Sequence, residues 1–276
     1  MSKVLYDAAS RVMDPTNTKN TVKDTWMENF PNSENTNPQL RKLSTSSDYA
    51  SFYQSLGVTS ADLSYRGNAN SDPRYKISPY PTYHTAYDTF DYVDRFVDPG
   101  FIAHWTVSRI SGLIMLLLSD SLVIPFDVKN FAAFVNSQVV ATESEFGTLL
   151  ADNNISLEYL KRAGNNFVAQ AQTFQSYIDT TLDRKDPKSI NAVNDRLLLL
   201  ERNFIEPKGL PGTLQLKHVS GSPASTSGSY ASFPGLKDSL FGISSGQLQQ
   251  WEVVKQQLAL VTYKIEMAAQ FLILNS

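Results

Sequence analysis

The 276 residues are 42% hydrophobic and 18% charged, a composition typical of a globular protein rather than a disordered one. The net charge of −3 is small and Lys and Arg form no cluster, which argues against a nucleic-acid-binding surface. The absence of cysteine excludes disulfides, thiolate metal sites and cysteine nucleophiles.

Residues 1–82 predict short elements of mixed type. The N-terminal stretch MSKVLYDAASRVMDP is amphipathic and lacks the apolar core of a leader, so no signal peptide is expected. The expected elements are a helix at 3–13, a loop or broken turn of helix at 15–39, a strand at 40–43, a helix at 48–57, an edge strand at 61–67 (ADLSYRG) and a long loop at 67–82.

From Thr85 to Pro125 the pattern becomes helical. Residues 89–99 predict a helix that ends at Pro99, and residues 100–125 predict a longer helix that is apolar nearly all round. Its most apolar run is interrupted by Asp120 and falls short of the roughly 20 clean residues that a membrane span needs. We therefore expect a buried core helix and no membrane segment.

After Pro125 the apolar residues recur with the spacing of a helical bundle. Helices are predicted at 127–152, through the region around 160–178, at 186–207 and at 245–274. The predicted core stripes are Val128, Phe131, Phe134, Val135 and Val139; Leu160, Phe167, Ala171, Phe174 and Ile178; and Leu248, Trp251, Val254, Leu258, Val261, Ile265, Ala268 and Leu272. Residues 208–235 are expected to form a long loop of the kind that is generally functional or disordered.

The residues alone thus predict an α+β fold that is mostly α, with a mixed α/β part before Pro125 and a helical bundle after it.

Three histidines are the first candidates for site chemistry. His84 lies in the stretch SPYPTYHTAYDTF, but a single histidine in such a loop is more often structural than a ligand, because a zinc site needs three or four ligands. His104 lies in the apolar helix and is interpreted as a core or interface residue, and His218 lies in the long loop.

Asp88, Asp91 and Asp94 recur every third residue, which suits a cation but equally suits a solvated helix face, and we favour the face. The spacing continues to Asp98 near a helix end, where an acid is unfavourable to the helix dipole. The sequence contains no G-x-S-x-G elbow, no phosphate-cradling loop and no H-E-x-x-H. No complete active site follows from the residues alone.

Four stretches resemble the glutamate carboxypeptidase II and transferrin receptor family. They are residues 40–58 (LRKLSTSSDYASFYQSLGV), residues 80–127 (YPTYHTAYDTF to VIPFD), NDRLLLLERNFIEPKGLPG with the KHV that follows, and SYASFPGLKDSLF. The resemblance implies that residues 1–125 are the C-terminal part of an M28-type zinc-peptidase domain. It likewise implies that residues 126–276 are a transferrin receptor-like helical dimerisation domain.

The resemblance also implies roles for individual residues. His84 occupies the place of a zinc ligand of a two-zinc site, Tyr83 that of a substrate-contacting tyrosine, and Tyr230 that of a second one. The other ligands and the glutamate general base belong to sequence that precedes this chain in the family. The resemblance therefore implies two zinc ions in an intact parent, and a vestigial site with no cofactor in this chain alone.

Several positions depart from the carboxypeptidase pattern. Ser46 and Ser47 stand where the peptidase has Gly-Asn, Asp62 and Ser64 stand where it has arginines, and Ser229 replaces a lysine that pairs with the substrate carboxylate. Since Asp62 would repel an acidic substrate, a preference for glutamate is in doubt.

Three functions remain open at this point. The first is a catalytically incomplete chain that acts as a homodimerisation module through its C-terminal helices. The second is half of a two-zinc exopeptidase that is completed by another chain, for example one carrying the missing part of the peptidase domain. The third is a receptor-like member without catalysis, which the retained His84 argues against. Intact members of the family are commonly type II membrane or secretory-pathway proteins, but no compartment follows for this chain.

Overall fold

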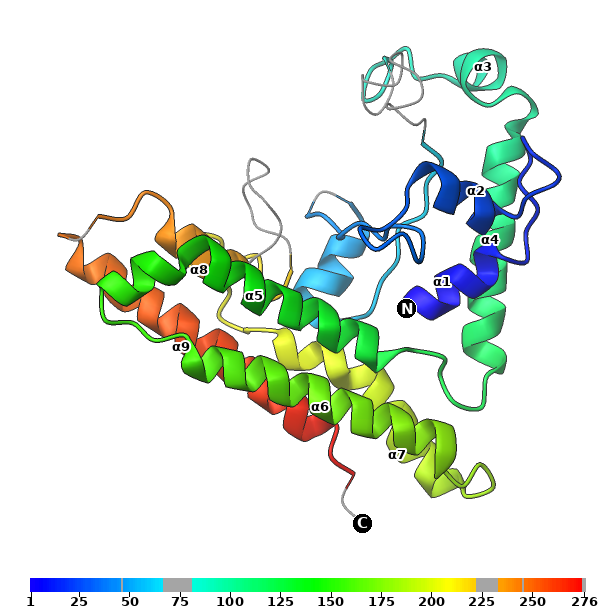
Figure 1. Ribbon diagram of the computed structural model, residues 1–276. Coiled ribbons are helices and arrows are strands. Elements are labelled where there is room, and N and C mark those ends of the chain that lie inside the picture. The colour runs from blue at the N-terminus through cyan, green and yellow to red at the C-terminus, as the bar shows by residue number, and fades with distance from the viewer. Residues whose placement is uncertain (46, 67–80, 222–232, 245, 275–276) are drawn as a thin grey trace. The chain divides into compact units, whose positions relative to one another are not determined.

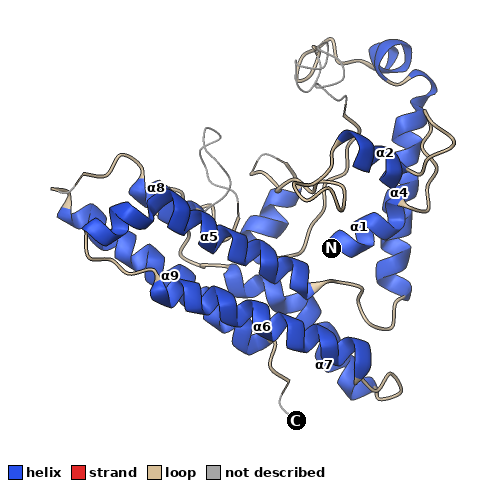
Figure 2. Ribbon diagram, in the orientation of Figure 1, coloured by secondary structure: helices blue, strands red, loops and turns tan. Residues whose placement is uncertain are grey.

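The computed structural model describes residues 1–45, 47–66, 81–221, 233–244 and 246–274, and these residues are mostly helical (Figures 1 and 2). The helical elements are α1 (Ser2–Ala9), α2 (Val22–Asn29), η1 (Ser51–Ser55), α3 (Phe90–Tyr92), η3 (Val93–Val97), η4 (Pro99–Phe101), α4 (Ile102–Asp120), α5 (Val128–Asp152), α6 (Glu158–Thr180), α7 (Pro187–Leu199), η5 (Leu200–Phe204), α8 (Pro234–Leu240) and α9 (Leu248–Phe271). They form two compact units, Met1–Arg41 with Asp62–Ser121 and Lys42–Ala61 with Leu122–Ser276.

The predicted strands are wrong for the residues that can be checked. Residues 40–43 and 61–66 run without regular secondary structure, and the described part of the chain contains isolated bridges but no strand. An extended segment becomes a strand only when a second segment completes its hydrogen-bond ladder, and no described segment pairs with these two in that way. The predicted α/β part is therefore not seen, whereas the prediction of a mostly helical chain is confirmed.

Helix α2 of the first unit lies within the proline-rich stretch 15–39, where the sequence predicts a loop or a broken turn of helix. Thr21 and Asp24 form a reciprocal capping box at the start of α2, so that part of the expected loop at 15–39 is helical. The hydroxyl of Tyr6 in α1 donates a hydrogen bond of 2.8 Å to the carbonyl oxygen of Pro38. This bond ties the end of the segment back to the first helix.

Helix α4 corrects the expectation of a buried core helix. It is as long and apolar as expected, but Trp105, Met115 and Leu116 are 61%, 67% and 58% exposed. The helical run Pro99–Asp120, with a mean hydropathy of 1.6 in its most apolar window, is long and apolar enough to cross a membrane. One such helix is weak evidence for a span, because core helices and signal sequences have the same length and composition.

In the second unit, α5, α6 and α9 lie side by side, and α6 contacts both of the others (Figure 1). Aspartates begin two of its helices: Asp127 accepts hydrogen bonds from the backbone N–H groups of Lys129 and Asn130, and Asp186 caps α7 ahead of Pro187 in the same way. The predicted stripes of α6 and α9 are buried, except that Leu248 at the start of α9 is 76% exposed. Helical periodicity thus predicted the core of this unit.

Residues 42–61 pack with the bundle although they precede it by sixty residues. Gly57 adopts a φ of +61°, and a Cβ there would come within 2.8 Å of the Cα of Arg202, so the backbone of this segment closely approaches η5. The ammonium of Lys42 lies 4.8 Å from the ring centroid of Phe134 in α5, and burial lowers the pKa of Lys42 to about 8. The second unit is therefore discontinuous in sequence, unlike the single boundary expected near Pro125.

The first part of the long loop predicted at 208–235 is ordered against the bundle. Leu210, Leu216 and Val219 are buried, and the N–H of Val219 donates a hydrogen bond of 2.9 Å to the carbonyl oxygen of Phe204. This part of the loop thus belongs to the core.

Candidate functional site

His84 lies in a turn of the first unit. Its side chain is exposed, its backbone φ is +60°, and its ring stacks on that of Tyr83 with 3.8 Å between the centroids. Positive φ is uncommon for a residue with a Cβ, although histidine is among those that adopt it more often. Tyr83 and His84 are consecutive in the sequence, so their contact does not test the roles that the resemblance implies.

The described residues do not fit a two-zinc site by themselves. Such a site needs several carboxylate and imidazole ligands that converge from different loops. Nowhere in the described part of the chain do three or more His, Asp or Glu side chains converge in a way that could hold a metal ion. The role of His84 as a zinc ligand stays a prediction, and no catalytic step through zinc is derived.

The other positions singled out by the resemblance are described only in part. Ser47, Asp62 and Ser64 are exposed. Ser46, Ser229 and Tyr230 lie outside the described residues, so the predicted substrate role of Tyr230 stays a prediction.

His104 is exposed rather than buried in a core, and Asp98 is its partner. The carboxylate of Asp98 accepts hydrogen bonds from the N–H groups of Ala103 and His104, at 3.0 Å each, and lies 2.6 Å from Nδ1 of His104. Burial raises the pKa of Asp98, but the hydrogen bonds from Ala103 and His104 outweigh it and lower the pKa. Asp98 directly follows η3, as expected of a residue near a helix end, but its carboxylate also accepts hydrogen bonds from N–H groups in the first turn of α4, where an acid is favourable to the helix dipole.

The neighbouring aspartates also have local structural partners. Asp91 forms an exposed ion pair with Arg95 at 3.3 Å, and Asp94 accepts a hydrogen bond from the N–H of Gly100. These contacts agree with the solvated face that we favoured over a cation site.

A buried polar cluster in the second unit centres on His218. The side chain of His218 is fully buried, and its Nε2 lies 3.1 Å from Oε1 of Glu201, whose side chain is 11% exposed. The N–H of Ser220 donates to Nδ1 of His218 at 3.2 Å, so the proton of the ring lies on Nε2 and points to the Glu201 carboxylate. The hydroxyl of Ser220 in turn donates to Oε1 of Gln138 in α5.

Three residues of the segment 42–61 belong to this cluster, and one of them, Thr59, donates a hydrogen bond of 3.3 Å from its hydroxyl to Oε2 of Glu201. The ring of Tyr53 stacks on His218 at 4.5 Å, and burial, followed by the nearby Glu201 carboxylate, raises the pKa of Tyr53. Gln54 is 2% exposed, and neither polar atom of its side chain has a hydrogen-bond partner among the residues that the structure describes. Since the cluster is closed to solvent, we assign it to joining the segment, the loop and the bundle rather than to chemistry on a substrate.

Sequence reasoning missed this cluster. Glu201 and His218 are seventeen positions apart and fit no motif, and His218 was noted only as a loop residue. The available signal was the acid Glu201 directly after the apolar run LLLL, since a charged residue beside a core stripe is usually paired when buried.

The sequence of the chain is similar to a known domain family and to several known proteins. Residues 155–273 match the transferrin receptor-like dimerisation domain. The chain is 37% identical to the rat protein named aminopeptidase NAALADL1, over 98% of this chain and 36% of that protein. It is 29% identical to a maize protein named probable glutamate carboxypeptidase VP8, over 93% of this chain and 34% of that protein.

The chain belongs to the glutamate carboxypeptidase and transferrin receptor-like family. This confirms the resemblance seen in the sequence. The similarity to the rat protein extends over nearly the whole chain, while the dimerisation-domain match covers all of α6, α7, α8 and α9. The chain spans little more than a third of the length of the first curated relatives it matches, so the activities in their names are those of longer proteins.

Proposed function

We propose that residues 1–276 act chiefly as a homodimerisation module through the C-terminal helices and do not hydrolyse peptides on their own. One observation carries the proposal: residues 155–273 match a dimerisation domain, and the helices within them share one buried core. A preformed, rigid bundle is a suitable platform for association, because no ordering of the chain opposes binding.

The surface of the second unit supports self-association. Its exposed large apolar residues include Val140, Tyr159, Leu198, Leu248 and Tyr263, each at least half exposed. Isologous dimers bury such side chains in the same patch of both copies.

The molar mass of the purified chain in solution tests the proposal. We expect light scattering behind size-exclusion chromatography to give about twice the 30.8 kDa of one chain, unchanged across a tenfold dilution. A mass of one chain at every concentration would contradict it.

The second candidate is a two-zinc exopeptidase site completed by another chain. The observation that favours it is the exposed apolar surface of α4, since an apolar helix of this length is normally covered by protein or lipid. In this reading His84 supplies one ligand and the completing chain supplies the others. Asp62 in place of an arginine would disfavour acidic side chains in its substrate.

Zinc-dependent turnover separates the two candidates. We expect the purified chain with added zinc to cleave neither an acidic dipeptide nor an aminopeptidase substrate above the buffer rate. Turnover that disappears in His84→Ala, while a control variant Lys129→Glu in α5 keeps it, would favour the enzyme.

A further inference from the structure

The turn between α5 and α6 contains the tripeptide Asn154-Ile155-Ser156. No other asparagine of the sequence has Ser or Thr two positions after it. Asn-x-Ser, with x other than Pro, is the acceptor tripeptide of N-linked glycosylation, and a folded chain can carry the bulky glycan only where the asparagine lies at the surface. The position of these three residues in the fold therefore decides whether the tripeptide can be a modification site.

Asn154 occupies the left-handed position that ends α5, with a φ of +58°. Its N–H donates a hydrogen bond of 2.9 Å to the carbonyl oxygen of Ala151, and the N–H of Ile155 donates one of 2.9 Å to that of Leu150. These two bonds form a Schellman motif, and Leu150 and Ile155 are both buried, as its apolar contact requires. The turn is therefore held against the core in one conformation.

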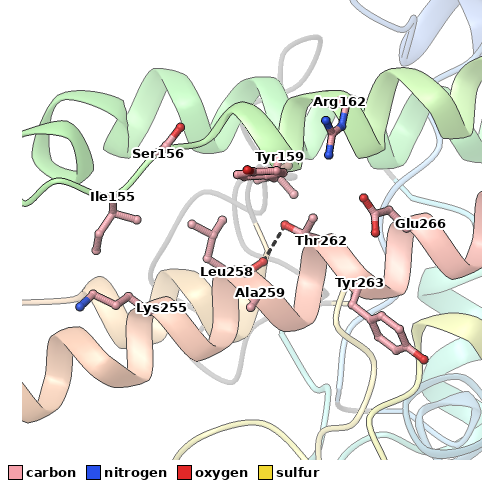
Figure 3. A pocket seen from close by; sticks show the side chains of 11 residues that line it. Ile155, Ser156, Tyr159, Arg162, Lys255, Leu258, Ala259, Thr262, Tyr263 and Glu266 are labelled. Carbon is pink, nitrogen blue, oxygen red and sulfur yellow. Dashed lines mark hydrogen bonds between the residues drawn. The ribbon is translucent and has the colours of Figure 1, made fainter.

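Apolar and polar side chains of this turn are directed to opposite sides. Ile155 and Leu157 are buried, whereas Asn154 and Ser156 are exposed. Figure 3, a view into the hollow between α6 and α9, shows Ile155 directed toward α9 and Ser156 directed away from it. The two polar groups of the acceptor tripeptide thus lie in solvent, while the apolar residues beside them anchor the turn.

The carboxamide of Asn154 makes no hydrogen bond to any residue that the structure describes, unlike that of its neighbour Asn153. Nδ2 of Asn153 donates a hydrogen bond of 2.8 Å to the carbonyl oxygen of Leu149. The Oγ of Ser156 accepts a hydrogen bond of 3.2 Å from the N–H of Glu158, which leaves its own proton available to a partner. A glycan on Nδ2 of Asn154 would therefore break no hydrogen bond of the described residues.

We propose that Asn154 is an N-glycan attachment site, modified when the chain enters the lumen of the secretory pathway. The donor is a lipid-linked oligosaccharide diphosphate. Nδ2 of Asn154 forms a bond to the anomeric carbon of the first sugar, and the bond from that carbon to the diphosphate oxygen breaks. The lipid diphosphate leaves with the electron pair, and one amide proton is released. The hydroxyl of Ser156 supplies the group that the glycosylating enzyme requires two positions after the acceptor.

Asn154→Gly separates the acceptor role of the residue from its role in the turn. Glycine is the most frequent residue at this position of a Schellman motif, so the variant keeps the backbone conformation and removes only the acceptor. The matched control is Asn153→Gln, which changes the neighbouring carboxamide and leaves the tripeptide intact. Ser156→Thr keeps the required hydroxyl, and Ser156→Ala removes it.

Translation of the whole chain behind a cleavable signal peptide, with microsomes from the endoplasmic reticulum, tests the site. We expect the wild type, Asn153→Gln and Ser156→Thr each to gain one glycan, seen as a slower gel band that a peptide-N-glycosidase returns to the unmodified mobility. Asn154→Gly and Ser156→Ala are expected to lose this band. Mass spectrometry of the wild type after the glycosidase should find aspartate in place of asparagine at position 154.

A second acceptor tripeptide controls for delivery to the lumen. Lys19→Thr completes one at Asn17, an exposed residue of the first unit, and is combined with Asn154→Gly. This double variant should gain one glycan, which shows that the enzyme acts on the chain. A wild-type chain that loses its signal peptide and stays unmodified beside this control would overturn the proposal, and so would a glycan that persists in Asn154→Gly alone.

Discussion

His218→Ala is expected to lower the free energy of unfolding by about 3–5 kcal/mol. The substitution removes a fully buried ring that stacks on Tyr53 at 4.5 Å and lies parallel to Phe204 at 6.0 Å. It also leaves the mostly buried Glu201 carboxylate without the imidazole partner at 3.1 Å, and a buried charge that has lost its partner is strongly destabilising. Chemical denaturation measures the effect, at one fixed protein concentration because association adds to stability.

Two further variants distinguish the stability lost by removing the buried ring of His218 from the stability lost by weakening its pairing with Glu201. Glu201→Gln keeps an oxygen that accepts the hydrogen bond from Nε2 of His218, so a smaller loss of about 1–2 kcal/mol is expected. His104→Ala removes the histidine of the Asp98 pair, whose ring is 60% exposed, and should change stability by less than about 1 kcal/mol. A His218→Ala chain as stable as His104→Ala would show that the cluster does not hold the unit together.

Phe167→Ala is expected to cost about 3–5 kcal/mol of unfolding free energy. Phe167 of α6 is fully buried and packs edge-to-face on Phe131 of α5 at 6.1 Å, while its ring lies 5.9 Å from that of Phe204 in η5. Removing it opens a cavity where three elements meet, and each neighbour also loses an aromatic contact.

An exposed phenylalanine serves as the control for this variant. Phe241, after α8, is 89% exposed, and Phe241→Ala should lie within about 0.5 kcal/mol of the wild type in the same denaturation experiment. Equal losses in Phe167→Ala and Phe241→Ala would contradict the assignment of Phe167 to the centre of the core.

The buried faces of helices can be predicted from the sequence because helical periodicity depends on residues that are close together in the chain. Leu160, Phe167 and Phe174 recur at a period that places them on one face of α6, and all three are buried as predicted. The strand predicted at 40–43 does not form, because a strand depends on a partner segment that its own residues do not specify.

The same distinction between neighbouring and distant residues applies to the candidate sites. His84 could be singled out because it lies next to Tyr83 in a stretch that resembles a family motif. The His218 cluster could not, since Tyr53, Glu201 and His218 come from three separate parts of the chain and meet only in the folded unit. Residues that meet only through tertiary packing have no characteristic spacing in the sequence, so no motif identifies them.

The sequence by itself determined the family, the mostly helical character and the apolar faces of α6 and α9, because periodicity and motifs depend on neighbouring residues. Only the tertiary structure decided that α4 exposes its apolar side chains, that residues 42–61 pack with the bundle, and that Glu201 is buried against His218. The physical reason is that burial and polar pairing depend on which distant segments come into contact. The same residue can be core, surface or interface according to that packing.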